Sequence, residues 1–283
     1  APGVPMAPPE GDAGTGMVAT DSVAVCTGNV SAGTSIFSMV VLERPLRRLY
    51  KDIDIVSTPS GHAVAMVHCN NGTSDLDAWM GLMAELAAKS GAEVSRAELF
   101  RLLFEESLKG APDCDGVLVY NYLSGEPVAG QTSGRPMVLR RSESALTLAN
   151  FMRSQIFSIF AALTMGMHIL TEENVRIRRL TGHGGLFKTP GVAQRYLSAA
   201  MGAPITVMET AGEGGPYGMA LLAGYCLWRQ EGETLEDYLD RRVFAGAAGE
   251  DIMATPEECQ GYRRYLDWYQ EILPAEALAA QRP

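Results

Sequence analysis

The chain has 283 residues, 47% hydrophobic and 20% charged, a composition typical of a globular protein with one large domain or two small ones. Its 33 acidic and 23 basic side chains give a net charge of -10, which argues against duplex nucleic acid or an anionic membrane surface as a main partner. A phosphate-bearing ligand would therefore be held mostly by backbone N–H groups and a metal ion.

The five cysteines share no C-x-x-C spacing, so we expect neither a disulfide framework nor a zinc knuckle. A reducing cytoplasm fits this cysteine usage best. The Pro-rich opening, residues 1–10, has no basic start and no apolar run, which indicates a linker and not a signal peptide.

A Gly-Asp-x-Gly-x-Gly run, residues 11–16, follows the linker and precedes a short apolar segment that predicts a helix. Asp12 then lies in the first helical turn, where a carboxylate is electrostatically favoured. Two interpretations of Asp12 stay open at this point, because the same residue type serves as an N-cap and as a reactive carboxylate.

The first half of the chain predicts a strand meander followed by two helices and two more strands. A Gly-, Ser- and Thr-rich segment, residues 27–35, has the composition of a hairpin tip. The run at residues 68–72, with Asp75 and Asp77 after it, has the residue types of a metal site, but a turn with an N-cap is the favoured interpretation. The expected strands cover residues 22–26, 34–42, 53–58, 62–68, 116–120 and 137–139, and the helices cover 75–90 and 95–109.

The second half alternates helices and strands, with Gly-rich turns at strand ends. Its longest apolar element, residues 144–170, is interrupted by polar residues and predicts a buried helix instead of a membrane span. The other expected strands are 175–180 and 205–208, and the other expected helices are 191–201, 216–230, 235–243 and 256–272. This order predicts a mixed α/β layered domain, whose ligand would lie at the Gly-rich turns.

Two Gly-rich turns lead from a strand into a helix, at residues 181–190 and 210–219. Glycine permits close backbone approach, and a helix N-terminus offers free N–H groups, so either turn is suited to a nucleotide. Taken alone, each motif is explained equally well as an ordinary glycine-containing turn between a strand and a helix. The chain contains no G-x-x-x-x-G-K-[ST] motif, which excludes a P-loop as the phosphate-binding element.

The order of these motifs is more specific than any one of them. A Gly-Asp helix start, a Gly-Thr-Ser hairpin, a long apolar helix, Gly-Gly-x-x-Lys-Thr-Pro and Gly-Pro-x-Gly-x-Ala follow one another over residues 10–230. This arrangement resembles the C-terminal half of the FGGY-family carbohydrate kinases, and among them the xylulokinase-like pentulose kinases.

The resemblance implies a ribonuclease H-like, actin-type ATPase fold, with a mixed sheet and flanking helices over residues 11–283. It also implies a kinase N-terminal domain that residues 1–10 would connect, and a homodimer would be compatible with it. The family's catalytic base falls on Asp12. The ATP phosphate-binding hairpin falls on Gly33, Thr34 and Ser35, and the adenine-side residues fall on Gly184, Gly185, Lys188, Gly215 and Gly218.

The implied activity is transfer of the γ-phosphate of ATP, with Mg²⁺, to a primary hydroxyl of a ketopentose such as D-xylulose. A sugar hydroxyl is a poor nucleophile at neutral pH, so a carboxylate must accept its proton. Two departures bear on this expectation. A bulky pair, Leu186-Phe187, stands in the adenine-side motif, where it would narrow or reshape the adenine pocket. The family's N-terminal domain has no counterpart in these 283 residues. We therefore expect this chain to be inactive alone. The alternative is a non-catalytic nucleotide-binding module of the actin superfamily that acts through a partner chain.

Overall fold

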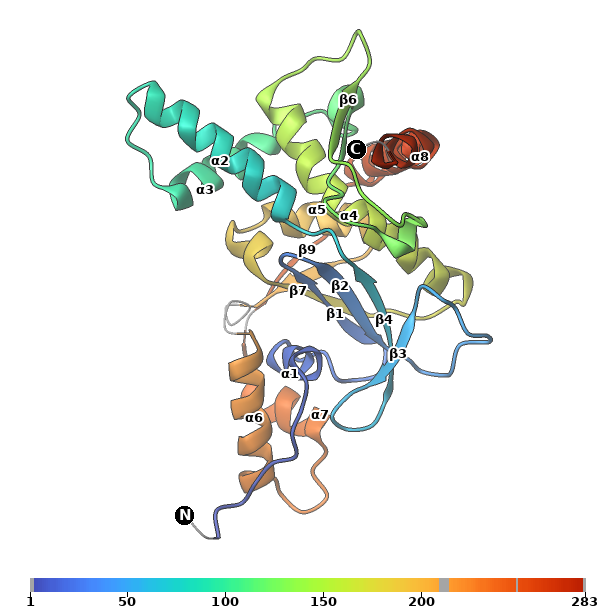
Figure 1. The fold of residues 1–283 in the computed structure, drawn as a ribbon. Helices are drawn as coiled ribbons and strands as arrows, with labels where there is room; N and C mark the ends of the chain where they lie inside the picture. Colours follow the sequence, from blue (N-terminus) through green and yellow to red (C-terminus); the bar gives the residue numbers. More distant parts are fainter. Residues whose placement is uncertain (1–2, 209–213, 248, 282–283) are drawn as a thin grey trace.

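A seven-stranded mixed sheet forms the centre of the molecule (Figure 1), in the order β3-β4-β2-β1-β7-β8-β9. The structure is a computed structural model that describes residues 3–208, 214–247 and 249–281. Its strands are β1 (Thr27–Ala32), β2 (Ile36–Val41), β3 (Asp54–Ser57), β4 (Ala63–Cys69), β7 (Arg179–His183), β8 (Ile205–Val207) and β9 (Glu250–Ile252).

Strand direction within this sheet decides which loops meet. β1 pairs in parallel with β7, and β7 in parallel with β8, whereas β1–β2, β2–β4, β3–β4 and β8–β9 are antiparallel pairs. In the β1–β7 register, Ser31 lies opposite His183. The carboxyl ends of these two strands therefore lie at one edge of the sheet, although about 150 residues separate them in sequence.

Helices cover both faces of the sheet (Figure 1). On one side lie α1 (Asp12–Ala19), α6 (Gly214–Trp228) and α7 (Leu235–Tyr238), which continues as a π-helical turn, Leu239–Val243. On the other side lie α4 (Leu148–Glu172), α5 (Val192–Met201) and α8 (Pro256–Ala280).

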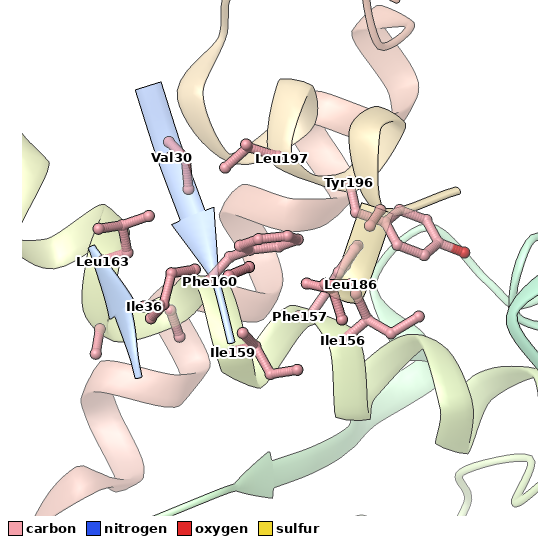
Figure 2. Packing of buried hydrophobic residues seen from close by; sticks show 14 of the residues in the cluster. Val30, Ile36, Ile156, Phe157, Ile159, Phe160, Leu163, Leu186, Tyr196 and Leu197 are labelled. Atoms are coloured by element: carbon pink, nitrogen blue, oxygen red, sulfur yellow. The ribbon is translucent and has the colours of Figure 1, made fainter. Parts of the chain in front are cut away.

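Strand alternation gives the sheet two hydrophobic cores. Ile36 and Val40 of β2 belong to the cluster with α4, α5 and α8, whereas Met39 and Val41 belong to the cluster with α1 and α7. Successive strand residues point to opposite faces, so one strand supplies both cores. Figure 2 shows Ile36 packed among Phe160 and other side chains of α4 in the first core.

The helix α4 lies at the centre of the first core. Its start is capped by Thr147, whose side chain accepts a hydrogen bond from the backbone N–H of Asn150 at 3.1 Å. By length and composition it is the one helix in the described ranges that is apolar enough to cross a membrane. Yet 72% of its most apolar window is buried inside the protein, as in the core helix of a globular domain.

Two further helices and a separate strand pair lie on the same side of the sheet as α4 (Figure 1) and add buried residues to the first core. They are α2 (Ser74–Lys89), α3 (Arg96–Ser107) and the antiparallel pair of β5 (Val117–Tyr120) and β6 (Met137–Arg140). Ser95 caps α3 by accepting a hydrogen bond from the N–H of Glu98 at 3.2 Å.

Several predicted boundaries are wrong. The last helix, predicted to end at residue 272, continues to Ala280. Three other errors have a local cause. Residues 22–26 are not a strand, because Cys26 has a φ of +65° and the N–H of Thr27 bonds to Ala24 O in a turn. The predicted hairpin tip at 27–35 is instead strand β1 followed by a tip of three residues, Gly33–Ser35. Strand β7 begins at Arg179, later than predicted, and continues through the Gly182 of the expected turn.

Candidate functional site

The β1–β2 tip and the turn after β7 meet at the carboxyl edge of the parallel strands. Gly184 follows β7 with a φ of +102°, a conformation that favours glycine. A Cβ atom there would lie 2.5 Å from the carbonyl oxygen of Ala32, the residue just before the tip. The structure thus brings Gly184 together with Gly33, Thr34 and Ser35, as the sequence motifs predict.

Carbonyl groups of the tip face the protein, and donor groups remain available. Gly33 O accepts from Thr73 N and Thr34 O accepts from Gly72 N, both at 2.8 Å. The backbone N–H groups of Thr34 and Ser35 have no hydrogen-bond partner within residues 3–208, 214–247 and 249–281, and Thr34 is exposed. Free N–H groups and hydroxyls at a hairpin tip form an anion-binding surface.

Helix α1 lies across the same two strands and carries Asp12. A Cβ atom on Gly16 would lie 3.6 Å from the His183 ring and 3.9 Å from the Asn29 side chain. Asp12 lies one turn earlier on the same face of α1, and it is exposed. Its Oδ1 accepts from the N–H of Ala13 at 2.8 Å, while Gly11 occupies the N-cap position. The N-cap interpretation of Asp12 is therefore wrong, and the carboxylate remains open to a ligand.

Two predicted adenine-side residues, Gly215 and Gly218, lie in α6 and face α1. A Cβ atom on Gly218 would lie 1.9 Å from the carbonyl oxygen of Thr15, and one on Gly215 would lie 3.2 Å from its hydroxyl. These glycines let the two helices pack at short range, and their contact with adenine stays a prediction. Part of the same motif, residues 210–213, lies outside the described residues.

The remaining adenine-side residues lie on the turn after Gly184. Gly185 and Lys188 are exposed, and no ion pair joins Lys188 to another described residue. Leu186 and Phe187 are 1% and 6% exposed and belong to the first core. Both side chains therefore point into the protein and away from the surface at Gly185, and their effect on an adenine pocket stays a prediction.

His183 is a buried residue of the site whose role the sequence pattern did not reveal. It is 8% exposed, and its Nε2 accepts from the Asn29 side-chain amide at 3.1 Å, which requires a neutral ring. Burial lowers the pKa of His183 to about 4. Asn29, in turn, is fully buried within a strand where an alternating pattern would place an apolar residue. A histidine directly before Gly-Gly is the only sequence signal that points to this pair.

The donor set at this edge suits a nucleotide phosphate better than a bare metal ion. Among the described residues, no group of three His, Cys, Asp or Glu side chains is placed to hold a metal. Magnesium is usually held by one or two carboxylates together with substrate phosphates and water. The tip N–H groups suit the phosphates, and most ligands of a magnesium ion would come from the nucleotide and from water.

Comparison with known proteins identifies the family and the fold. The model of the FGGY family of carbohydrate kinases, C-terminal domain, matches residues 28–227. No curated protein sequence matches the chain.

Solved structures of sugar kinases share the fold. The ligand-bound xylulose kinase from Lactobacillus acidophilus superposes with a TM-score of 0.71 at 15% identity, covering 94% of this chain and 51% of that one. Gluconate kinase from Lactobacillus acidophilus gives 0.70 at 16% identity, covering 94% and 51%. Plasmodium falciparum glycerol kinase with ADP gives 0.66 at 13% identity, covering 93% and 50%. The expected actin-type ATPase fold is confirmed, and the chain spans about half the length of these structures.

The buried neutral His183 predicts a specific loss of stability in acid. In the unfolded chain its pKa is about 6.5, so the unfolded state binds an extra proton as pH falls from there towards the folded value of about 4. Relative to pH 7, the free energy of unfolding should fall by about 2 kcal/mol at pH 4.5 from this residue alone. Urea unfolding of the wild-type chain and His183→Gln at both pH values isolates the effect, because all other titrating groups are shared. Equal pH dependence in the two proteins would contradict it.

We expect the replacement of Gly185 by valine to weaken nucleotide binding and to leave the fold intact. Apart from its two chain neighbours, no atom of residues 3–208, 214–247 and 249–281 lies within 4 Å of a Cβ at Gly185, so we expect the new side chain to disturb a ligand and not the fold. The Kd for ADP, measured by calorimetry, should rise roughly tenfold or more, about 1.4 kcal/mol. Gly81→Val in α2 is the control, since its surroundings are equally open. Unchanged affinity in folded Gly185→Val would place the nucleotide elsewhere.

Proposed function

The chain belongs to the FGGY family of carbohydrate kinases as a C-terminal domain, and on that premise we propose that it is the ATP-binding half of a sugar kinase. The complete enzyme transfers the γ-phosphate of ATP to a primary hydroxyl of a ketopentose, with D-xylulose as the first choice. Several structural neighbours are xylulose kinases, which supports this choice, although gluconate and glycerol kinases share the fold. We place the enzyme in the cytoplasm.

The observation that carries the proposal is the polarity of the β1–β2 tip. The carbonyls of Gly33 and Thr34 are bonded to the protein, and the N–H groups of Thr34 and Ser35 have no hydrogen-bond partner among the described residues. In this proposal these donors bind the ATP phosphates, and Gly184 and Gly185 let the nucleotide approach the backbone closely. Because backbone N–H groups, and not basic side chains, provide most of the phosphate contacts, a chain with a net negative charge is able to bind a negatively charged nucleotide.

Asp12 is the proposed general base. Its exposed carboxylate accepts the proton of the attacking sugar hydroxyl, which increases the nucleophilicity of that oxygen towards the γ-phosphorus. Phosphoryl transfer depends mainly on positioning and charge stabilisation, which the tip donors supply from this chain. When bound, Mg²⁺ neutralises charge on the phosphate oxygens.

An exposed apolar helix supports the proposal of a partner domain. The buried residues of α6 are two glycines, Gly218 and Gly224, whereas Trp228 is 65% and Leu227 is 51% exposed. Apolar surface of this kind usually marks an interaction site. Since the chain spans half the length of its structural neighbours, we propose that the family's N-terminal domain covers α6 and completes the sugar site.

The separated chain should therefore bind nucleotide but phosphorylate no sugar. In this proposal the N-terminal domain supplies most of the contacts to the sugar and closes over the nucleotide from the other side. A coupled assay of ADP release with D-xylulose measures this directly, and the full-length kinase is the positive control. Measurable turnover of any pentulose by the purified 283-residue chain would overturn it.

Removal of the Asp12 carboxylate in the full-length kinase tests whether Asp12 acts as the general base. Asp12→Asn keeps the size of the side chain and should lower kcat by roughly 10²–10⁴-fold, because general base catalysis contributes about that much. The KM for ATP and the thermal stability should change little. Glu10→Gln is the matched control, since Glu10 is a neighbouring acid that bonds only to the N–H of Gly11. Near-normal kcat in Asp12→Asn would remove Asp12 from the mechanism.

A further inference from the structure

The loop between β4 and α2, residues 70–73, lies directly against the phosphate-binding tip. Gly72 N donates to Thr34 O and Thr73 N donates to Gly33 O, each at 2.8 Å. A Cβ atom on Gly72 would lie 2.2 Å from Gly33 O, so a larger residue has no room there. The run that the sequence presented as a turn or a metal site is thus a direct support of the tip.

Asn121 holds this loop from the opposite side. It follows β5, is 2% exposed, and its side-chain amide donates to Asn71 O at 3.1 Å and to Gly72 O at 2.9 Å. Each accepted carbonyl shares a planar trans peptide with one of the two N–H groups that bond to the tip. In a trans peptide the C=O and N–H point in opposite directions. The two peptide groups are therefore held between Asn121 and the tip.

Asn71 locks the same loop to residues 123–126. Its Oδ1 accepts from the N–H groups of Leu123 at 2.9 Å and Ser124 at 3.1 Å, and its Nδ2 donates to Glu126 Oε2 at 3.1 Å. Glu126 is fully buried, and its Oε2 also accepts from Asn71 N at 3.2 Å. Breaking one of these buried bonds would leave a desolvated polar group, which disfavours rearrangement of the loop.

We propose that Asn121 is a positioning residue for nucleotide binding. Through the two peptide groups it keeps the tip carbonyls turned towards the protein, so the N–H groups of Thr34 and Ser35 point outward to the phosphates. This inference rests on the proposed function for its ligand, but the mechanical link between Asn121 and the tip is independent of any ligand.

The test is Asn121→Ala in the 283-residue chain, with Asn70→Ala as the matched control. Asn70 lies in the same loop and is exposed, and its amide donates to Gly125 O instead of supporting the tip. In Asn121→Ala, hydrogen exchange at the Gly72 and Thr73 amides should accelerate roughly tenfold, the change expected for loss of one or two hydrogen bonds. The Kd for Mg·ADP should rise roughly tenfold, and both quantities should stay within about twofold in Asn70→Ala.

A second variant changes the contact between the loop at residues 70–73 and the β1–β2 tip directly. Gly72→Ala places a Cβ against Gly33 O and should raise the Kd for Mg·ADP at least as much, whether or not Asn121→Ala folds. Unchanged exchange in Asn121→Ala, or unchanged affinity in folded Gly72→Ala, would overturn the inference. Failure of the wild-type chain to bind ADP would contradict the proposed function, and the exchange rates would still decide the role of Asn121.

Discussion

Parallel pairing of β1 with β7 is the constraint on which the rest of the structure depends. With Ser31 opposite His183, the β1–β2 tip and the Gly184 turn leave the sheet at the same edge. Helix α1 can then cross both strands, with Gly16 against His183, and bring Asp12 towards that edge. Three segments that are far apart in sequence thus supply backbone N–H groups without a partner among the described residues, a glycine turn and a carboxylate.

The stability of the fold and the geometry of the site come from different interactions. Apolar burial on both faces of the sheet stabilises the domain, with α4 filling one core and α1 and α7 the other. The site depends instead on short backbone contacts and buried polar groups. Gly184 approaches Ala32, Gly72 approaches Gly33, and Asn121 holds the loop behind them. Small changes at these positions should therefore weaken ligand binding while leaving the apolar burial that stabilises the fold largely unchanged.

The sequence was sufficient to predict most elements and the meeting of the main motifs. Periodicity identified α2, α3, α4 and α5, and the order of the Gly-rich motifs singled out the tip and Gly184, which the structure brings close together. Their role in ligand binding stays a prediction. The sequence did not reveal that Leu186 and Phe187 point into the core, because their orientation depends on tertiary packing. The Phe187 ring packs against the backbone of β7 at Gly182, where a Cβ atom would lie 2.7 Å from the ring. Nor did it reveal the role of Asn121, since local patterns carry no information about partners 50 residues away.

The most direct test of the central claim is an amide NMR titration of the 283-residue chain with Mg·ADP. It reports at each backbone N–H which groups meet the ligand, with no need for the rest of the enzyme. If the edge formed by β1 and β7 binds the nucleotide, the largest shifts should occur at the Thr34, Ser35 and Gly185 amides, while those of β5 and β6 stay unchanged. Saturable binding that leaves the tip amides unshifted would contradict the account.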